Sequence, residues 1–370
     1  MKILHVFRTP VGGLFRHVRD LARGQYEMGH EVGIICDSTT GGGTAVQLLD
    51  GIAPSCKLGI ERISISRLPG FGDFSAIRRT RGHAQKLGAD VVHCHGAKGG
   101  LYGRLAAWSL GIPSVYTPHG GSLHYDWLGF PGAVFLASEW ALARFGSGMI
   151  FVCEFERRNF AQKIGLGNIG NTVIHNGLWT EEFYRIRPGD DAADVLFLGD
   201  MRYLKGVDVL LKALAIIRRK RSVSACLVGD GPDLAAFQSL AQALGLADNV
   251  MFPGRLPTAE ALRRGRLLVL PSRAESFPYV VLEAAAGCVP IIASEVGGIP
   301  EILPAKNLCP VANPEALARH IEMALAIPGA IAADATALAE ATEASFSAET
   351  MARRVTDFYC QLLPAPQNPI

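Results

Sequence analysis

The chain has 370 residues, of which 49% are hydrophobic and 19% charged, so it can bury the cores of two domains and is not intrinsically disordered. Its net charge of +2 argues against nucleic acid as the main partner. The charge is uneven: residues 1–180 hold 18 basic and 12 acidic residues, which favours an anionic acceptor or an anionic membrane surface for this half.

In the first half of the chain, short apolar strands alternate with helical patterns. We expect strands at 3–7, 31–36, 60–65, 91–93, 114–117, 149–153 and 172–175. Helical patterns lie between several of them, at 14–28, 75–88, 98–110 and 154–164. Strands that alternate with helices predict a parallel, doubly wound sheet.

Residues 176–193 differ in character, because they contain the turn signals Asn176-Gly177 and Pro188-Gly189. A second series follows, with strands expected at 195–198, 224–228, 249–252, 267–270 and 290–293 and helices at 206–219, 233–245, 258–264, 278–287, 313–327, 330–344 and 347–363. The fold class that we predict is α/β, with two Rossmann-like doubly wound domains facing across a cleft. Ligands then bind at the carboxyl ends of the strands.

Eight cysteines are scattered without any C-x-x-C pair, and most lie in apolar strand-like runs, which is typical of a reducing compartment. Residues 1–7 are too short for the apolar region of a signal peptide. The most apolar long stretch, residues 129–153, is interrupted by Glu139 and Arg144 and so does not read as a membrane span. We therefore expect a cytoplasmic protein.

The most informative segment runs from Glu275 to Glu283, with Ser276-Phe277-Pro278-Tyr279 directly after the first carboxylate. It joins a carboxylate on a turn, a second carboxylate inside a helix, and the start of that helix. Helix starts bind phosphate because their first amides are unpaired and the helix dipole favours negative charge. Carboxylates accept hydrogen bonds from sugar hydroxyls, so the segment suits a molecule that carries both a sugar and a diphosphate.

Two cations, Arg202 and Lys205, follow the first strand of the second half, where they would neutralise a diphosphate. The usual carboxylate pair for a metal-bound nucleotide sugar, Asp-x-Asp, occurs nowhere in the sequence. We therefore expect cations and a helix start, and no metal or other cofactor, to stabilise a leaving diphosphate. Gly12-Gly13, after the first strand, would let a ligand approach the backbone.

Histidines end two of the predicted strands, in His93-Cys94-His95 and at His119. Neighbouring residues on a strand point to opposite faces, so His93 and Cys94 cannot easily share one metal ion. His119, on a glycine-rich loop at a strand end, is the better candidate for a site residue.

These motifs, in this order, resemble the retaining glycosyltransferases of the GT-B fold, "glycosyl transferases group 1" or family 4. The resemblance rests on Gly12-Gly13 with His17 on the following helix, residues 91–104, residues 117–120, Asn176-Gly177, Arg202 with Lys205, residues 229–232, Glu275 with Glu283, and residues 297–301. It extends over nearly the whole chain, and the paired glutamates with the trailing Gly-Gly-x-x-Glu are its most specific part. The segment from residues 95–100 onward looks like bacterial enzymes that build exopolysaccharide, capsule or lipopolysaccharide.

The resemblance implies a role for each residue. Arg202 and Lys205 would grip the donor diphosphate, Glu275 would hold hydroxyls of the donor sugar, and Glu283 would hold the ribose. The backbone of Ser276, Phe277, Pro278 and Tyr279 would meet the phosphates, with Gly12 and Gly13 approaching from the other domain. His119 would lie near the anomeric carbon. Domains are expected at 1–178 and 194–345, with a linker at 179–193 and a final segment, 346–370, that returns to the first domain.

The expected reaction is a metal-independent transfer of a hexose, with retention, from a UDP- or GDP-sugar to a glycan or a lipid-linked acceptor. The acceptor could lie at the inner face of the plasma membrane, where basic helices around residues 16–23 and 78–81 would suit an anionic surface. Three alternatives stay open: a nucleotide-sugar 2-epimerase, a phosphorylase with pyridoxal phosphate, and a non-catalytic subunit that binds a sugar nucleotide. The donor's base and sugar, the acceptor and the oligomeric state do not follow from the sequence.

Overall fold

The computed structural model describes residues 1–121 and 126–363, in two compact units. The first unit holds residues 1–176 and the segment that begins at Ala348, and the second holds residues 177–347. The segment 179–193, predicted to be a linker, belongs to the second unit, because Ile186 N donates to Gly287 O and Gly189 N to Arg263 O, both at 2.9 Å.

The first unit is built on a seven-stranded parallel sheet in the order β3-β2-β1-β4-β5-β6-β7. In chain order its strands are β1 (Lys2–Val6), β2 (Glu31–Asp37), β3 (Gly59–Ile63), β4 (Val91–His95), β5 (Ser114–Thr117), β6 (Gly148–Phe151) and β7 (Gly170–Val173). Strand β5 has the bounds that the sequence predicts, and the other strands differ from prediction by a few residues at their ends.

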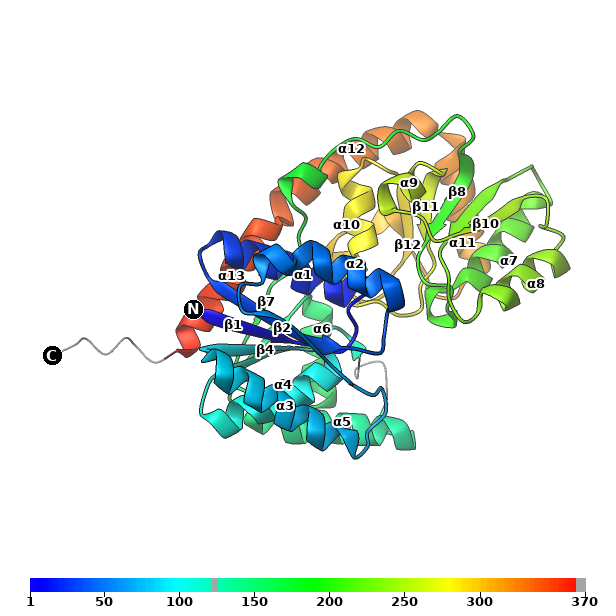
Figure 1. Cartoon of the computed structure of the whole chain (residues 1–370). Coiled ribbons are helices and arrows are strands. Elements are labelled where there is room, and N and C mark those ends of the chain that lie inside the picture. The colour runs from blue at the N-terminus through cyan, green and yellow to red at the C-terminus, as the bar shows by residue number, and fades with distance from the viewer. Residues whose placement is uncertain (122–125, 364–370) are drawn as a thin grey trace. The chain divides into compact units, whose positions relative to one another are not determined.

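Helices cover both faces of this sheet (Figure 1). Successive strand residues point to opposite faces, so Ile3 packs with the helices of one face and Leu4 with those of the other. The first face carries α1 (Gly12–Glu27), α2 (Gly42–Ile52) and α13 (Ala348–Leu362); the second carries α3 (Gly72–Leu87), α4 (Gly96–Leu110), α5 (Phe130–Leu142) and α6 (Glu154–Lys163). The fold class predicted from the sequence is confirmed for this unit.

The last helix, α13, completes the core of the first unit although it follows the second unit in the chain. Its residues Val355, Phe358 and Tyr359 are buried against Ile3 and Val91 of the sheet. A helix that covers one face of a sheet needs a continuous apolar stripe toward the sheet and polar residues on its other side. The sheet face above β1 and β4 is therefore closed by the C-terminal part of the chain.

The second unit contains a six-stranded parallel sheet in the order β10-β9-β8-β11-β12-β13. Its strands are β8 (Ala193–Leu198), β9 (Ala225–Val228), β10 (Val250–Gly254), β11 (Gly265–Leu270), β12 (Ile291–Ser294) and β13 (Leu308–Cys309). Its helices are α7 (Val207–Arg218), α8 (Leu234–Ala243), α9 (Thr258–Leu262), α10 (Tyr279–Ala286), α11 (Pro314–Ala326) and α12 (Pro328–Ser345).

No single helix in the described part of the chain has both the length and the apolar composition that crossing a membrane requires. Helices α11 and α12 meet that test only as a pair, and the chain bends by 100° between them. Helix α11 packs into the main core of the second unit through Leu317 and Ile321.

Each sheet has one point at which the strand order reverses. In the first unit the chain runs outward from β1 through β2 to β3, and then restarts at β4 on the other side of β1. In the second unit β8 and β11 stand in the same relation. Ligands of open α/β sheets bind at such reversals, beyond the carboxyl ends of the strands, because the two following loops separate there.

Candidate functional site

At the reversal in the second unit, the loop after β8 packs directly on the loop after β11. Gly206 ends the first loop with φ +69°, and a Cβ at this position would lie 1.9 Å from the carbonyl oxygen of Pro271. Only glycine allows this contact, because a side chain would clash with backbone and the left-handed conformation disfavours other residues. The close approach brings the predicted cation loop against the predicted carboxylate loop.

An ion pair joins the two loops. Lys205 Nζ lies 2.6 Å from Glu275 Oε1, which also accepts a hydrogen bond of 2.7 Å from Ser272 Oγ. The Glu275 carboxylate is only 9% exposed and the Lys205 side chain 28%. The sequence predicts separate roles for these two residues, and the structure places each as a partner of the other.

A second contact between the same loops was not predicted from the sequence. Arg273 binds Asp208 with two hydrogen bonds of 2.7 and 2.8 Å, donates to Tyr203 O at 2.8 Å, and stacks on the Tyr203 ring at 3.9 Å. Burial alone would raise the pKa of Asp208, but the hydrogen bonds and charge of Arg273 outweigh it and lower this pKa. Arg273 therefore clamps the start of α7 to the loop that carries Glu275.

Arg202 lies on the same loop as Lys205 but faces solvent. Its side chain is 54% exposed, and its Nε lies 3.9 Å from Asp200 Oδ2, a weak surface pairing. Lys205 N donates to Arg202 O at 2.9 Å, so the two residues stand at either end of one short turn, Tyr203–Lys205. An exposed guanidinium beside a held ammonium is a suitable arrangement for binding an anion from solution.

The loop after β12 packs against the turn between β11 and α10. Gly298 N donates to Ser276 O at 2.7 Å, and a Cβ on Gly297 would lie 2.1 Å from Glu275 O. Pro278 precedes α10, whose N-terminus has no side-chain cap, and Phe277 and Tyr279 are buried beneath it. Glu283 lies one turn into this helix and is half-buried. The predicted phosphate-binding segment is thus a rigid helix start.

In the first unit, the start of α1 offers open backbone. Gly12 has φ +79°, and a Cβ on Gly12 or Gly13 would meet no atom within 4 Å. The preceding residue, Val11, provides no side-chain cap. This helix start can therefore accept a ligand close to its amides, as the sequence predicts in outline.

Beside α1, the structure gathers five histidines on one face of the first sheet. His5, His93 and His95 share this face because β1 pairs with β4 in register, with His5 opposite His93. His17 of α1 and His119, which follows β5, complete the group, and the His17 and His119 rings are 4.8 Å apart between centroids. All except the half-buried His119 are fully buried.

A chain of hydrogen bonds runs through three of these rings. His5 Nε2 meets Gln25 Oε1 at 2.8 Å, His5 Nδ1 meets His95 Nε2 at 3.0 Å, and His95 Nδ1 meets His119 Nε2 at 3.1 Å. Because an amide oxygen only accepts, His5 carries its proton on Nε2 and accepts at Nδ1. In neutral rings the same direction continues along the chain: His95 donates from Nε2 and accepts at Nδ1, so His119 donates from Nε2 and has its lone pair on Nδ1.

Burial keeps these rings uncharged near neutral pH. It lowers the pKa of His5 and of His17 to about 4, from an ordinary value of 6.5. Burial, reinforced by the neighbouring histidines, holds the pKa of His93, His95 and His119 well below the usual range. The cluster is a neutral polar network inside an apolar sheet.

The sequence predicts only His119 of this cluster as a site residue, although His17, His93 and His95 lie in the motifs that carry the resemblance. The prediction treats His93 and Cys94 as neighbours, whereas His93 and His95, two positions apart, are the pair that shares a face, with ring centroids 3.9 Å apart. Cys94 points to the opposite core. The i, i+2 spacing on a strand places His93 and His95 on one face, but the contact of His5 and His17 with them follows only from the strand order.

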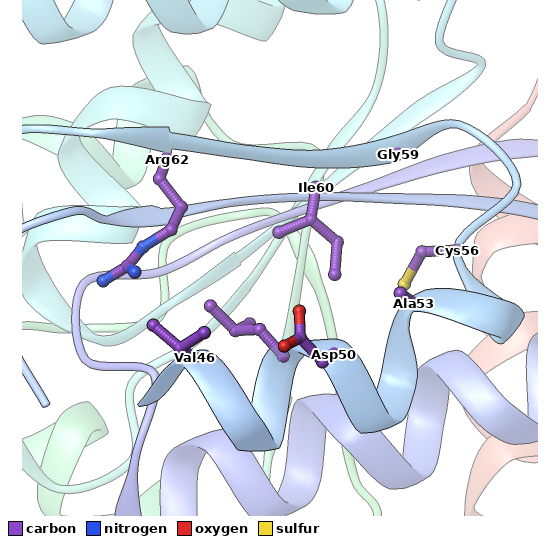
Figure 2. A pocket seen from close by; sticks show the side chains of 8 residues that line it. Val46, Asp50, Ala53, Cys56, Gly59, Ile60 and Arg62 are labelled. Atoms are coloured by element: carbon purple, nitrogen blue, oxygen red, sulfur yellow. The ribbon is translucent and has the colours of Figure 1, made fainter. Parts of the chain in front are cut away.

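A pocket of about 230 Å³ also lies in the first unit, between α2 and β3. Figure 2 shows Val46 and Asp50 of α2, with Ala53 directly after the helix, facing Ile60 and Arg62 of β3. Strand β2 separates this pocket from the reversal between β1 and β4. It contains none of the predicted site residues.

Comparison with known families divides the chain close to the boundary between the units. The model of the "Glycosyltransferase Family 4" domain matches residues 11–182, and that of "Glycosyl transferases group 1" matches residues 180–343. Together the two matches extend over both of the sites described above.

Two characterised relatives illustrate the range of similar proteins. A D-inositol 3-phosphate glycosyltransferase of Segniliparus rotundus is 31% identical over 57% of this chain, and the match spans 52% of that protein, about half its length. A glycogen synthase of Mycobacterium tuberculosis is 27% identical over 97% of this chain and 95% of its own. The names of the two relatives differ in acceptor.

Solved structures share the fold over the full length. A sucrose-phosphate synthase of Thermosynechococcus elongatus superposes with a TM-score of 0.80 at 22% identity, over 98% of this chain and 99% of its own. The Anabaena protein HepE, solved with UDP and glucose, gives a TM-score of 0.81 at 22% identity, over 98% and 100%. At this level of identity the likeness establishes the two-domain GT-B fold.

Proposed function

The chain belongs to the GT-B glycosyltransferases, with a family 4 domain followed by a group 1 domain, and from this premise we propose a specific reaction. We propose that it transfers a hexose, with retention and without a metal, from a nucleoside-diphosphate sugar to a glycan or lipid-linked acceptor. The observation that carries the proposal is the Lys205–Glu275 pair, which places a cation and a carboxylate side by side at the strand reversal of the second unit.

The donor diphosphate is bound by positive groups of the second unit. Arg202 is exposed and free to turn toward an anion, Lys205 is held beside it, and the uncapped start of α10 faces the same edge of the sheet. Glu283 binds the ribose and Glu275 the sugar hydroxyls. HepE, which has this fold, was solved with UDP and with UDP-glucose, which supports a uridine nucleotide as the first donor to test.

In this scheme the protein acts mainly by stabilising the leaving group. As the bond between sugar and diphosphate breaks, negative charge grows on the diphosphate oxygen, and Lys205 and Arg202 lower the energy of that charge. The same oxygen then accepts the proton of the acceptor hydroxyl on the face that the diphosphate leaves, which gives retention. Glu275 positions the sugar and is not a nucleophile, since its carboxylate is already engaged by Lys205 and Ser272.

His119 completes the proposed machinery from the first unit. Its chain of neighbours leaves the lone pair of Nδ1 available, so a neutral His119 can accept a hydrogen bond from a sugar hydroxyl. Gly12 and Gly13, with no atoms above them, would admit the donor phosphates to the backbone of α1. Both assignments are proposals that follow from the resemblance of these motifs to the family.

The acceptor is proposed to reach the protein from an anionic membrane surface. Leu68, Phe71 and Phe74, at and before the start of α3, are 69%, 94% and 74% exposed. Arg78 and Arg79 follow on the same helix, and Arg79 pairs with Glu61 at 3.1 Å. Exposed apolar side chains beside arginines suit the interface of an anionic bilayer. Co-sedimentation with anionic vesicles, lost on replacing Phe71 and Phe74 by serine, is expected; equal binding to neutral vesicles would argue against it.

The other predicted membrane-facing helix has a weaker case. On α1, Arg16 and Arg19 both pair with Asp20, at 2.6 and 2.8 Å, and Arg23 pairs with Glu27. These arginines are therefore partly neutralised by their own helix. We propose α3, on the inner face of the plasma membrane, as the side that approaches lipid.

The decisive experiment measures donor binding and donor turnover separately. A panel of UDP- and GDP-sugars is screened for thermal stabilisation, and release of nucleoside diphosphate is then followed with the best donor in EDTA. Loss of Lys205 or Arg202 by substitution with alanine is expected to lower turnover by about 10²–10³-fold. Lys212→Ala, which removes an exposed lysine of α7, is the matched control and should leave turnover unchanged.

Four outcomes would redirect the proposal. Wild-type rates in both alanine variants would remove Arg202 and Lys205 from the site. Conversion of the donor to an epimerised sugar nucleotide without any acceptor would favour the epimerase, and a pyridoxal absorbance band in the purified protein would favour a phosphorylase. Tight donor binding with no release of nucleoside diphosphate in cell extract would favour a non-catalytic subunit.

A further inference from the structure

The histidine cluster of the first unit has one ring nitrogen left over. His17 Nδ1 meets Asn176 Oδ1 at 2.9 Å, while His17 Nε2 is buried and has no hydrogen-bond partner among residues 1–121 and 126–363. A buried polar atom without a hydrogen-bond partner destabilises a fold by about 1–3 kcal/mol. The unpaired nitrogen of His17 therefore points to a ligand from outside the chain. The ring of His17 lies edge-on to the rings of both His95 and His119.

Three histidine rings, that of His17 among them, come together here. One nitrogen each of His17, His95 and His119 lies within 4.8 Å of the other two, and His95 Nδ1 is 3.1 Å from His119 Nε2. Tetrahedral zinc, with Zn–N distances of about 2.1 Å, separates its nitrogen ligands by about 3.4 Å. The nitrogens of His95 and His119 are already close to that spacing, and the nitrogen of His17, within 4.8 Å of both, needs to move by no more than roughly 1 Å.

We propose that His17, His95 and His119 form a binding site for a divalent transition-metal ion of the zinc type, with its fourth position open to water or another ligand. Three imidazoles without a carboxylate favour zinc, cobalt, nickel or copper over magnesium and calcium, which prefer oxygen. The site is therefore distinct from a metal that would carry a diphosphate, and it goes beyond the proposed transfer reaction.

The surrounding hydrogen bonds are those of a metal site's outer shell. Histidine ligands commonly donate their second N–H to an oxygen or another fixed group, which sets the ring orientation. His17 does so through Nδ1 to Asn176, and His95 through Nε2 to His5, which is anchored in turn by Gln25. When the ion takes the lone pair of His95 Nδ1, the proton of His119 moves from Nε2 to Nδ1, so no net proton is gained or lost.

The neighbouring triad, His5 with His93 and His95, is a poorer candidate. Both nitrogens of His93 are already bonded, Nδ1 to Tyr359 OH and Nε2 to Thr117 Oγ1 at 2.8 Å. Both nitrogens of His5 are also bonded. An ion there would break existing hydrogen bonds without satisfying an orphan, and all three rings are fully buried.

An ion in the proposed site would engage His119 through its Nε2. The half-buried position of His119 offers the ion a way in, since the other two ligands are fully buried. Zinc on Nε2 would leave a proton on Nδ1 in place of the lone pair, so His119 could no longer accept a hydrogen bond from a hydroxyl of the donor sugar. The site would then act as an inhibitory one, which transition metals occupy and chelators clear.

The test uses EDTA-treated, dialysed wild-type protein titrated with Co²⁺ and, in parallel, with Zn²⁺. One ion per chain is expected, with the intense visible absorption of tetrahedral Co²⁺ that Zn²⁺ then displaces. His17→Gln and His119→Gln should each weaken binding by about 100-fold or more, since even outer-shell changes cost 10–100-fold. His83→Gln, which alters a histidine of α3 outside the cluster, should bind as wild type does.

The proposal is overturned if wild-type protein binds no Co²⁺, or binds it with the weak absorption of an octahedral aquo ion. It is also overturned if the glutamine variants bind as tightly as the wild type. Because His17 is buried, each variant is first checked by thermal unfolding in EDTA. If His17→Gln does not fold, the half-buried His119→Gln decides alone. None of these readouts depends on glycosyl transfer, so the proposed function can fail without affecting this result.

Discussion

Gly206 shows how strongly a single residue shapes the donor side of the molecule. It has a left-handed backbone and lies against the carbonyl of Pro271, and through this contact the loop of Lys205 reaches the loop of Glu275. Gly229 and Gly297 have the same character, since a Cβ on either would lie about 2 Å or less from a backbone oxygen of a neighbouring loop. Glycine here determines how closely the loops can approach.

We expect Gly206→Ala to destabilise the second unit by about 3 kcal/mol. Left-handed backbone costs a non-glycine residue about 1–2 kcal/mol, and relieving the clash with Pro271 adds about 1–3 kcal/mol. The control is Gly254→Ala, which has φ +80° and no atom within 4 Å, so it bears the backbone cost alone. Hydrogen exchange of second-unit amides measures both variants, and equal losses would refute the packing argument.

Among the helices and strands, α13 has the clearest structural role. It covers β1, β4, β5 and β6 of a sheet that the rest of the first unit leaves uncovered at this place. Tyr359 also reaches the histidine cluster, where its hydroxyl meets His93 Nδ1 and Gln25 Nε2. The helix thus contributes to both the apolar core and the polar network.

Val355→Asp is expected to unfold the first unit at ordinary temperature. The side chain of Val355 is fully buried, and an unpaired carboxylate there costs several kcal/mol, a large share of the stability of a domain. Arg353→Asp, which changes the charge more but lies on the exposed face of the same helix, should be tolerated. Circular dichroism melting and gel filtration distinguish the two variants. A well-folded Val355→Asp protein would mean that α13 is dispensable.

Most elements could be predicted from the sequence, and the two missed helices share a reason. The start of α2 lies among Gly41, Gly42 and Gly43, which signal a loop. Helix α5 belongs to the apolar stretch in which no single face stands out, so its period is hard to recognise. In both cases tertiary packing supplies the helix that local propensity does not indicate.

The candidate site was predictable in its residues but not in its pairings. Arg202, Lys205, Glu275 and the start of α10 lie where strand ends place them, and the sequence motifs indicate each. The ion pair between Lys205 and Glu275 joins residues 70 positions apart, and the bond between His5 and His95 joins residues 90 positions apart. Such contacts depend on the strand order, which a sequence pattern does not contain.

For the whole molecule, the distribution of histidine predicts that acid acts on the units unequally. Of the ten histidines, only His320 belongs to the second unit. His5 and His17 have a pKa of about 4 in the folded protein and about 6.5 when unfolded. Between these values the unfolded chain binds protons that the folded chain excludes, so stability falls as the pH falls.

We therefore expect the first unit to lose stability as the pH drops from 6.5 toward 4. Each such histidine contributes up to about 1.4 kcal/mol per pH unit within that window. Hydrogen exchange in EDTA at several pH values, resolved by peptide, would show first-unit amides opening before those of the second unit. A parallel decline of both units would contradict the role given to the buried histidines.

The return of α13 to the first unit also sets an order of events during synthesis. The second unit is one continuous segment, residues 177–347, so it can finish folding as soon as that segment has left the ribosome. The first unit must wait for residues 348–362, and until then the apolar face around Ile3 and Val115 lacks the cover that α13 provides. The nascent chain can thus complete its later domain before its earlier one.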